Sequence, residues 1–472
     1  MKTKIVLFAV LMLLSLQNFA NKRHKHSQLI KKVAIADSVV KITIKPFPIL
    51  SFIPPALTEK QLGWFAEAGF NVMMIHPDEK DYSTLKKYWK GNWMLFKEFN
   101  YKGFDYKSMV DFHVEDPKRI GFFLGDEPKT YQLDDLKKQY DFLRAKHPNM
   151  ISLVNLFPSY VSQSVLQSSY REYVDQYFAK LRPAYASLDN YPNYRLGYEG
   201  TTYYHDLEIM RETAQKYNCK ILGFVQVYSS DAMRDVSDSD LAWQVNSLLA
   251  YGSKGLFYFY FRHPVVAINE LTNSELMKTN KKDSVYDFKQ GRLKVPAFNV
   301  YEFGSGVLNA QDQKGERFDD VAKINAQALA WGEILIDLKS LKVRHILGFN
   351  EPFPPVGTDE FATKNWAGVD EQYIAKIDSK DKTQNMGYIL SYFEDVQNRP
   401  YIMIVNKKHG DNMSCELGNL TSTISFKNEI VNVYSISNKT GKEESIQLDT
   451  NNSFECEISG GGAILLRLEL KK

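Results

Sequence analysis

Two adjacent carboxylates end an apolar run in the stretch GFFLGDEPKT, at residues 121–130. Asp126 and Glu127 are residue types suited to general acid–base chemistry, because two close carboxylates raise the pKa of one of them toward neutrality. Pro128 follows at once and lacks the backbone N–H with which a strand pairs to its neighbour. We therefore expect a buried strand that stops at residue 126 because its end forms a site.

Polar side chains also stand at the ends of other apolar runs. The runs cover residues 47–53, 71–76, 93–99, 119–126, 150–156, 184–190, 219–227 and 255–261. The polar residues at their ends, which we expect to bind a substrate, are His76, Asn155, Asp189, Tyr191, Gln226, Tyr228, Tyr260 and Arg262. If these ends meet at one edge, their hydroxyl, amide and charged groups favour a polyhydroxylated ligand.

Amphipathic stretches separate the apolar runs, as expected of helices that alternate with strands. The first begins at Thr58, and the others lie at residues 80–90, 104–115, 131–147, 160–181, 203–217, 238–251 and 317–339. Most apolar runs lack polar alternation, which is typical of strands buried on both faces of a parallel sheet. Eight strands alternating with eight helices predict a (β/α)8 TIM barrel.

A barrel of this kind carries its site at the carboxyl ends of its strands. The run that ends at Asp126 would be the fourth strand. Period two places Phe123, Gly125 and Glu127 on one side of that strand. We expect that side to face the barrel axis, so that Glu127 points into the mouth. Asp126 would then point away, unless the strand twists at its end.

The character of the sequence changes after residue 341. The later segments are short, β-rich and separated by turns, which is typical of an antiparallel β-sandwich. The predicted fold class is therefore α/β, a (β/α)8 TIM barrel followed by a C-terminal antiparallel β-sandwich. The predicted organisation is a leader at residues 1–20, a lead-in at 21–46, the catalytic barrel at 47–341, a loop-rich linker at 342–386 and the sandwich at 387–472.

The leader has the pattern of a cleavable signal peptide. Lys2 and Lys4 precede an apolar run that is too short for a comfortable membrane span, and Ala20 offers a small residue for cleavage. We find no second apolar run long enough to cross a membrane. The sequence therefore predicts a secreted or periplasmic protein.

Composition excludes several classes of partner. The net charge of +3 gives no general attraction to nucleic acid or acidic membranes. Cys219, Cys415 and Cys456 are too few for a disulfide framework, although Cys415 and Cys456 could pair. The sequence contains no motif for a metal or an organic cofactor, so we expect neither. Nothing in the sequence indicates an oligomeric state.

An exported barrel whose fourth strand ends in Asp-Glu-Pro, with a β-sandwich behind it, resembles the barrel glycoside hydrolases. In the clan A families the fourth strand ends in Asn-Glu-Pro, whose Glu is the general acid/base, and the seventh strand supplies a nucleophilic Glu. Glu127 and Pro128 match that pattern, whereas Asp126 replaces the Asn and Gln226 stands nearest the nucleophile. An amide cannot form a glycosyl-enzyme, so this mechanism would need another carboxylate.

The adjacent pair also resembles the substrate-assisted hexosaminidases, particularly glycoside hydrolase family 123, in which the pair is likewise followed by proline. This resemblance implies that the 2-acetamido oxygen of the substrate attacks the anomeric carbon. Asp126 would orient the acetamido group, and Glu127 would protonate the leaving oxygen and later activate water. Tyr191 or Tyr228 would hydrogen-bond the acetamido carbonyl. Family 123 members carry an N-terminal β-domain, for which residues 21–46 leave no room.

These patterns predict an exported glycosidase that acts on an oligosaccharide or polysaccharide, by substrate-assisted hydrolysis of a 2-acetamido sugar. One alternative is a clan A-like glycosidase of neutral sugars in which Asp189 is the second carboxylate. Another is a catalytically silent barrel that binds glycan, an alternative that Gln226 keeps open. A literal Asn-Glu-Pro at residues 350–352 lies after the last helix and beside a proline-rich stretch, so we expect Glu351 to have no catalytic role.

Overall fold

The computed structural model describes most of the chain beyond the predicted leader. The described residues are 42–96, 110–195, 202–230, 232–263, 285–287, 292–295, 298–302, 304, 306–348, 351, 354–356, 362–363, 372–380 and 387–471. The leader at residues 1–20 lies outside them. Among the described residues, no helix combines the length and the apolar character needed to cross a bilayer.

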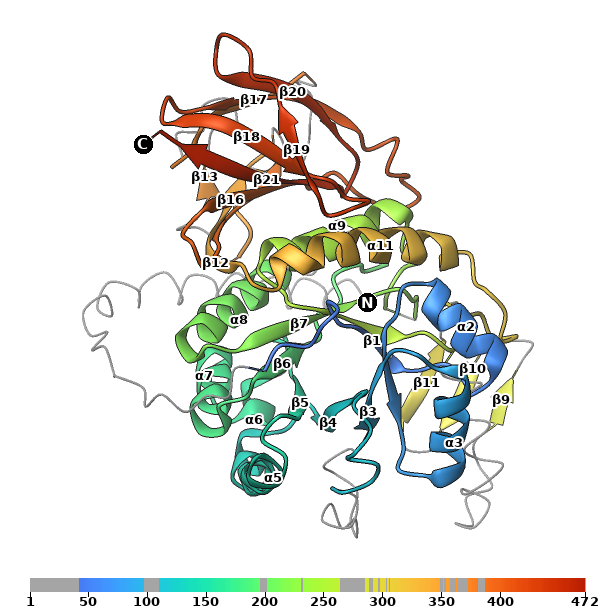
Figure 1. Ribbon diagram of the computed structural model, residues 1–472. Coiled ribbons are helices and arrows are strands. Elements are labelled where there is room, and N and C mark those ends of the chain that lie inside the picture. The colour runs from blue at the N-terminus through green and yellow to red at the C-terminus, as the bar shows by residue number, and fades with distance from the viewer. Residues whose placement is uncertain are drawn as a thin grey trace, which may run out of the picture. The chain divides into compact units, whose positions relative to one another are not determined.

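Eight parallel strands form a closed barrel in sequence order (Figure 1). They are β1 (Ile49–Ile53), β2 (Val72–Ile75), β3 (Asn92–Phe96), β4 (Arg119–Asp126), β5 (Ile151–Leu156), β6 (Tyr185–Leu188), β7 (Lys220–Val225) and β8 (Leu256–Tyr260). Each strand lies within the corresponding predicted run or starts one residue before it. The predicted (β/α)8 barrel is therefore confirmed, and the carboxyl ends of all eight strands meet at one mouth.

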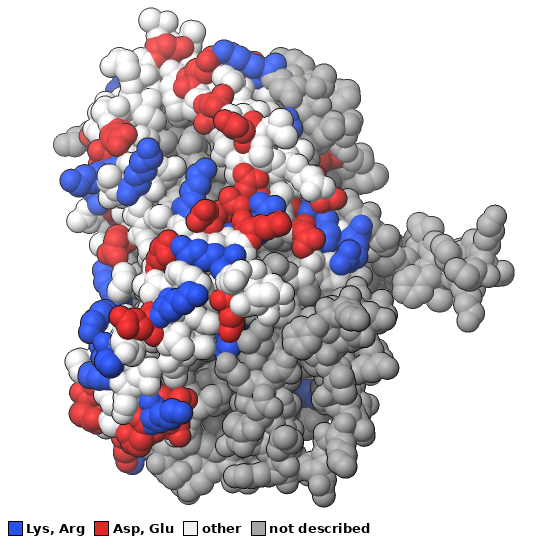
Figure 2. Space-filling model, turned by 90° about the vertical axis from the view of Figure 1, so that its right-hand side faces the viewer, with Lys and Arg blue, Asp and Glu red and all other residues white. Residues whose placement is uncertain are grey.

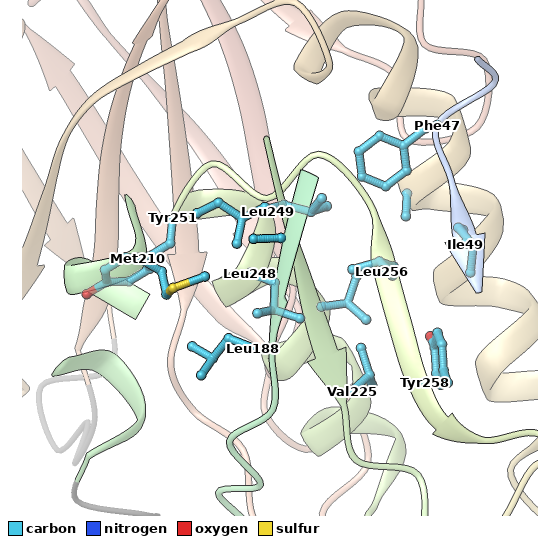
Figure 3. Packing of buried hydrophobic residues seen from close by; sticks show 14 of the residues in the cluster. Phe47, Ile49, Leu188, Met210, Val225, Leu248, Leu249, Tyr251, Leu256 and Tyr258 are labelled. Carbon is cyan, nitrogen blue, oxygen red and sulfur yellow. The ribbon is translucent and has the colours of Figure 1, made fainter. Parts of the chain in front are cut away.

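Helices surround the barrel. They are α2 (Glu59–Glu67), α3 (Glu79–Tyr88), α5 (Leu133–Lys146), α6 (Gln163–Leu166), α7 (Tyr170–Leu181), α8 (Tyr203–Tyr217), α9 (Asp238–Ala250) and α11 (Phe318–Leu335). A short 3-10 helix, η2 (Thr130–Gln132), precedes α5. Figure 3 shows how Val225 and Leu256, on the outer side of the strands, lie among Leu188, Leu248 and Leu249 in the layer between strands and helices.

Two predicted helices differ from the structure. Residues 160–181 were expected as one helix but form α6 and α7, because Gln167 adopts a left-handed conformation, with φ of +59°, that ends α6. Ser169 then caps α7 through a reciprocal pair of hydrogen bonds with Glu172. Of the predicted helix at 104–115, residues 110–115 form turns and the rest lies outside the described residues.

The barrel interior is filled by side chains at alternate positions of the strands. Leu50, Met74, Met94, Phe123 and Leu153 belong to this apolar cluster, which is separate from the layer between strands and helices. Strands buried on both faces explain why the sequence shows apolar runs without polar alternation.

The chain after α11 forms two sheets that are antiparallel apart from one short parallel pair of strands, and the two sheets share an apolar core. One sheet has the order β13-β12-β15-β16-β21-β18-β19 and the other the order β14-β17-β20. Their strands are β12 (Lys339–Ile346), β13 (Ala362–Thr363), β14 (Ile374–Ser379), β15 (Tyr388–Glu394), β16 (Pro400–Asn406), β17 (Leu420–Phe426), β18 (Ile430–Ile436), β19 (Glu443–Ile446), β20 (Ser453–Ile458) and β21 (Ala463–Leu470). The predicted C-terminal β-sandwich is therefore confirmed.

The segment expected to be a linker takes part in this sandwich. Between residues 342 and 386 lie most of β12 and the whole of β13 and β14, and β12 pairs with β15 along its length. A further antiparallel sheet, β11-β10-β9, lies in the insertion after β8 and consists of β9 (Val285–Asp287), β10 (Arg292–Val295) and β11 (Phe298–Glu302). The exact domain boundaries stay a prediction.

The sandwich and the barrel share one hydrophobic cluster. Phe393, Met403 and Leu465 from the sandwich belong to the same buried cluster as the outer faces of the barrel strands. Gly461, with φ of +66°, lies so close to α9 that a Cβ atom there would come within 2.1 Å of the Ser239 carbonyl oxygen. Close backbone contact of this kind requires glycine.

Charge and cysteines add two observations. Lys and Arg side chains are interspersed with Asp and Glu over the described part of the face in Figure 2. Cys219, Cys415 and Cys456 are all free thiols, so the pairing of Cys415 with Cys456 does not form.

Candidate functional site at the barrel mouth

A β-bulge at the end of β4 changes the direction of the two carboxylates. Phe123 pairs with Leu153, whereas Asp126 pairs with Asn155, so β4 uses three residues where β5 uses two. Bulges re-aim the side chains that follow them. Leu153 belongs to the barrel interior and Asn155 lies two residues later on the same side. Asp126 therefore faces the interior rather than away from it, because period two breaks at the bulge. The same break removes the basis for placing Glu127 on the side of Phe123 by period two, so the direction of Glu127 stays a prediction.

Asn155 connects the carboxylates at this end of the barrel. It is 1% exposed, and its Nδ2 donates a hydrogen bond to Asp126 Oδ1 at 2.9 Å. Its Oδ1 accepts a hydrogen bond from Ser187 Oγ at 3.2 Å. A hydrogen bond from Asn155 also favours the ionised form of Asp189. Asn155 was predicted to bind substrate, but its amide is hydrogen-bonded to protein groups. Asn155 is therefore a positioning residue.

The backbone holds Glu127 in an unusual conformation. Its φ is +49°, which is uncommon for a residue other than glycine and contrary to the extended conformation favoured before proline. Such strain costs on the order of 1–3 kcal/mol and persists only where the surroundings impose it. Here the Glu127 N–H donates to the Asn155 carbonyl oxygen at 2.9 Å. The Pro128 carbonyl oxygen then accepts from the Tyr173 hydroxyl at 2.8 Å.

The two adjacent carboxylates have different electrostatic surroundings. Burial, and then the charge of Asp126, raise the pKa of Glu127 to about 7. Burial also raises the pKa of Asp126, but the hydrogen bond from Asn155 opposes that rise. Pairs whose surroundings separate their pKa values can divide acid and base roles. Glu127 is therefore suited to donate a proton near neutral pH, and the hydrogen bond from Asn155 favours the ionised form of Asp126 beside it.

A third carboxylate lies close enough to interact with this pair. Burial, and then the charges of Glu127 and Asp126, raise the pKa of Asp189 well above its ordinary range. Asp189 Oδ1 and the Tyr191 hydroxyl are buried and have no hydrogen-bond partner within the described part of the chain. Leaving a buried polar atom unpaired costs about 1–3 kcal/mol. At a barrel mouth, two such atoms are suited to groups of a bound ligand.

Tyrosine and phenylalanine rings continue the site toward β8. The Tyr191 ring lies 5.4 Å from the Tyr228 ring and 5.6 Å from the Phe259 ring, measured between centroids. Tyr228 and Phe259 are themselves 4.9 Å apart. The structure thus brings the two predicted tyrosines together, on the side of the site away from β4.

Gln226 is not available to a substrate, contrary to the prediction. It is completely buried, and its Oε1 accepts from the Asn193 backbone N–H at 3.0 Å. Its Nε2 donates to the carbonyl oxygens of Asn193 and Tyr228 at 3.3 and 3.1 Å. The amide therefore holds the loops after β6 and β7 in place. Its position at the end of a strand indicated a polar role but not its partners.

Tyr260 and Arg262 also differ from the prediction that they bind substrate. The Tyr260 ring is completely buried, and its hydroxyl donates to the Gly304 carbonyl oxygen at 2.8 Å. Arg262 is 4% exposed and forms a two-pronged ion pair with Asp312, with distances of 2.9 and 2.6 Å. Both residues fix the start of the insertion after β8. His76 is exposed at the end of β2, with its ring 5.4 Å from Phe96, and its role stays a prediction.

The sequence reading missed one residue near the carboxylates. Tyr160, in the loop after β5, is 49% exposed, yet burial, and then the charge of Asp189, raise the pKa of its hydroxyl. The side chain thus lies beside the site and presents part of its ring to solvent. Tyr160 lies four positions beyond β5, outside the ends of the apolar runs at which polar residues indicate a site.

Glu351 in the literal Asn-Glu-Pro motif is a structural residue. Its Oε2 accepts from the backbone N–H groups of Gly348 and Gly387 at 2.6 and 2.8 Å, and its Oε1 pairs with Lys407 at 2.6 Å. Lys407 is 1% exposed, so the pair is largely removed from water.

As for metals, the described residues include no group of three or more His, Cys, Asp or Glu side chains placed to bind an ion.

Comparison with known proteins gives only distant structural likenesses. No protein-family profile and no curated protein matches the sequence. Among similar solved structures is an alpha-galactosidase from Saccharomyces cerevisiae with raffinose, at 8% identity and a TM-score of 0.45, covering 90% of this chain and 98% of that one. Another is a glycoside hydrolase family 5 protein from Bacteroides vulgatus, at 10% identity and a TM-score of 0.44, covering 87% and 84%.

A third is a putative alpha-galactosidase from Bacteroides fragilis, at 8% identity and a TM-score of 0.44, covering 90% of this chain and 80% of that one. Likenesses of this size do not decide a function. The resemblance to family 123 stays a prediction.

Proposed function

We propose that this protein is a glycoside hydrolase in which Glu127 is the general acid/base and Asp126 its ionised partner. The observation that carries the proposal is the state of Glu127. It is half-buried, strained and poised to hold a proton near pH 7, beside a second carboxylate at the carboxyl end of β4. Protonation of a glycosidic oxygen by a raised-pKa carboxylic acid is the step common to these hydrolases.

Within this function, we propose substrate-assisted hydrolysis of a 2-acetamido sugar. The acetamido carbonyl oxygen would form a bond to the anomeric carbon while the glycosidic bond breaks and Glu127 gives its proton to the leaving oxygen. Water would then attack the anomeric carbon, give a proton to the Glu127 carboxylate and release the acetamido oxygen. Asp126 would stabilise the positive charge on the acetamido group, and Tyr191 would donate its unpaired hydroxyl to it.

The competing mechanism needs an ionised nucleophile, and neither candidate supplies one readily. Asp189 favours its neutral form because of its burial and its two carboxylate neighbours. Gln226, nearest the seventh-strand position of clan A, is an amide bound to backbone groups. These observations favour the acetamido oxygen as nucleophile. A clan A-like enzyme that uses Asp189 is the alternative, and a silent glycan-binding barrel is the other.

Initial rates on paired aryl glycosides, each 2-acetamido sugar beside its 2-hydroxy counterpart, test the proposal. We expect turnover of acetamido sugars only, lost by at least about 100-fold in Glu127→Gln and Asp126→Asn. Glu351→Gln, checked for folding by circular dichroism, should retain turnover. Turnover of 2-hydroxy sugars that disappears in Asp189→Asn would support the clan A-like alternative. Glycan binding without turnover in both wild type and Glu127→Gln would support the silent barrel.

The pH dependence gives an independent check of the role of Glu127. A group with a pKa of about 7 that must be protonated makes kcat/KM fall about tenfold per pH unit above neutrality. A flat profile from pH 4 to 8 would contradict an acid role.

We also propose that the protein is exported through the leader. N-terminal sequencing of the mature protein tests this proposal, and we expect cleavage near Ala20.

A further inference from the structure

The sandwich contacts the barrel through the turn that follows β16. Helix α9 lies against β7 of the barrel and against β15 and β16 of the sandwich. His409, in the turn after β16, stacks on Trp243 of α9, with 3.9 Å between the ring centroids and 10° between the ring planes. Both side chains are buried. A sandwich histidine is therefore part of the buried contact between the two domains.

The position of this turn is set within the sandwich. Asn406, the last residue of β16, is completely buried, and its Nδ2 donates to the Gly418 carbonyl oxygen at 2.9 Å. The Asn406 Oδ1 accepts from the Lys408 backbone N–H at 2.9 Å. The Lys408 carbonyl oxygen in turn accepts from the Gly461 N–H at 2.9 Å. The residue before His409 is thus held by the sandwich itself.

His409 also belongs to a buried cluster of charged groups. Its Nδ1 lies 2.7 Å from Asp240 Oδ1. Because an ionised carboxylate can only accept, the Nδ1 carries the hydrogen and donates it. Arg234 Nη2 donates to the same Asp240 oxygen at 2.8 Å. Asp240 is completely buried, so a single carboxylate joins a sandwich histidine to a barrel arginine where water does not compete for the bonds.

Arg234 extends this cluster to two loops at the barrel mouth. Its Nη2 donates to Asn193 Oδ1 at 3.1 Å, and its backbone N–H donates to the Asn193 carbonyl oxygen at 3.1 Å. Asn193 lies in the loop after β6, and Arg234 lies in the loop after β7. The carbonyl oxygens of both residues accept from Gln226 Nε2, at 3.3 and 3.4 Å. The two loops are therefore joined to each other and to Asp240.

The loop after β6 also carries the tyrosine assigned to the ligand. Tyr191 lies two residues before Asn193, and Pro192 between them has a fixed φ. A shift of Asn193 would therefore move Tyr191. The Tyr191 hydroxyl has no hydrogen-bond partner among the described residues, so no protein group holds it directly. Its direction depends on the backbone of its loop and on packing of its ring against Tyr228.

We propose that His409 of the sandwich is a positioning residue for the reaction at Glu127. By its hydrogen bond to Asp240 it fixes Arg234, and Arg234 fixes the loop that directs the Tyr191 hydroxyl at the substrate. The role of Tyr191 rests on the proposed function, whereas the connection from His409 to the loops does not. The sandwich is thus required for the geometry of the mouth.

Two variants separate the hydrogen bond of His409 from its ring. His409→Phe keeps a ring against Trp243 but cannot donate to Asp240. His409→Asn loses the ring but keeps an N–H donor close to the position of Nδ1. We expect only the first to loosen the loops, because the proposal depends on the donor. A packing role alone would make His409→Asn the more harmful change.

Hydrogen–deuterium exchange followed by mass spectrometry tests the connection without any substrate. We expect residues 189–195 and 232–237 to exchange at least about threefold faster in His409→Phe than in wild type, and at near wild-type rates in His409→Asn. Exchange in α5 should be unchanged and serves as the reference. If His409→Phe does not fold, Asp240→Asn breaks the same bond from the barrel side and should loosen the same loops. Unchanged exchange in these loops would overturn the inference.

Initial rates on the acetamido glycoside that wild type hydrolyses test the role in the reaction. His409→Phe should lower kcat/KM by at least about fivefold, and His409→Asn should recover most of that loss. Added to Tyr191→Phe, His409→Phe should cause no further loss, because the loop then has no hydroxyl to direct. Losses that add in the double variant would contradict the assignment.

The matched control breaks another buried bond between the same helix and the same sandwich. The Tyr251 hydroxyl, at the C-terminal end of α9, lies 2.7 Å from His345 Nε2 on β12. Tyr251→Phe should lower the thermal midpoint but leave kcat/KM and exchange in the two loops as in wild type. Equal losses of activity in Tyr251→Phe and His409→Phe would show a general effect of the interface and overturn the inference.

The outcomes separate this inference from the proposed function. Hydrolysis that is lost in Glu127→Gln but unchanged in folded His409→Phe would leave the function standing and overturn the inference, whatever the exchange rates. Faster loop exchange in His409→Phe, with no hydrolysis of any glycoside by wild type, would overturn the proposed function and support the connection from His409 to the loops.

Discussion

At the scale of single residues, Glu127 combines two unfavourable features. Its backbone has a positive φ before a proline, and its carboxylate lies where burial and Asp126 oppose ionisation. Neither feature strengthens the fold. Both are expected where a side chain is held in place for chemistry, at some loss of stability.

We predict that Glu127→Gln stabilises the protein in a pH-dependent manner. Because its folded pKa is raised from 4.5 to about 7, the wild-type carboxyl loses stability as pH rises through that window. At about 1.4 kcal/mol per pH unit, the variant should match wild type near pH 4 and exceed it at pH 8 by on the order of 3 kcal/mol. Urea unfolding at both values measures this. The same difference at pH 4 and pH 8 would count against the raised pKa.

Residue types and spacing were enough to predict part of the site. Asp126, Glu127, Asp189 and Tyr191 all stand at ends of apolar runs, and the structure gathers them at one mouth. Partners could not be predicted in the same way, because they depend on loops that meet only in the fold. Gln226 binds backbone groups of such loops, although it stands at the end of an apolar run just as Asp189 and Tyr191 do.

At the scale of elements, the β-bulge in β4 is the feature that the sequence did not reveal. Leu124 is apolar like the residues around it, so an extra residue in the strand leaves the hydrophobic pattern unchanged. Strand positions were predictable because each buried strand appears in the sequence as an apolar run bounded by turn residues. The phase of a strand after a bulge depends on pairing with its neighbour, and that phase decided the direction of Asp126.

The N-terminus of α9 provides a second prediction at this scale. Asp240 accepts hydrogen bonds from Arg234 at 2.8 Å, from His409 at 2.7 Å and from the Ser237 N–H at 2.8 Å. Burial alone would raise the pKa of Asp240, but Arg234 and His409 lower it to about 2. The stability that Asp240 contributes is therefore complete above its ordinary pKa of 3.8 and is lost as pH falls through about 2.

We expect Asp240→Asn to lower the free energy of unfolding at pH 6 by on the order of 2 kcal/mol. The gap between variant and wild type should narrow as the pH falls below 3.8 toward 2. Denaturant unfolding at pH 6 and pH 3 measures both values. A gap that widens on acidification would contradict the assigned ion pairs.

At the scale of the whole molecule, we expect the barrel and the sandwich to unfold as one cooperative unit. They share one buried cluster, and Gly461 brings a sandwich turn against α9. The sequence indicated two architectures correctly. It did not indicate that residues 342–386, expected to be a linker, would contribute strands, because β12 becomes recognisable only through its pairing with β15.

We predict that Gly461→Ala destabilises barrel and sandwich together. The added Cβ would collide with the Ser239 carbonyl oxygen and occupy a positive φ, so the thermal midpoint should fall in one cooperative transition. The control is Gly410→Ala, whose Cβ would meet only Met413, at 3.9 Å. Calorimetry that resolved separate barrel and sandwich transitions in wild type would contradict the shared core.

The positive φ of Glu127 also has a consequence for the history of the gene. Glycine adopts that conformation without strain, and each glutamate codon is one base change from a glycine codon. Random mutation therefore offers glycine at this position repeatedly, and selection for heat tolerance alone would keep it. A laboratory population evolved only for survival at high temperature should lose the carboxylate early, while one that must also feed on the substrate should retain it.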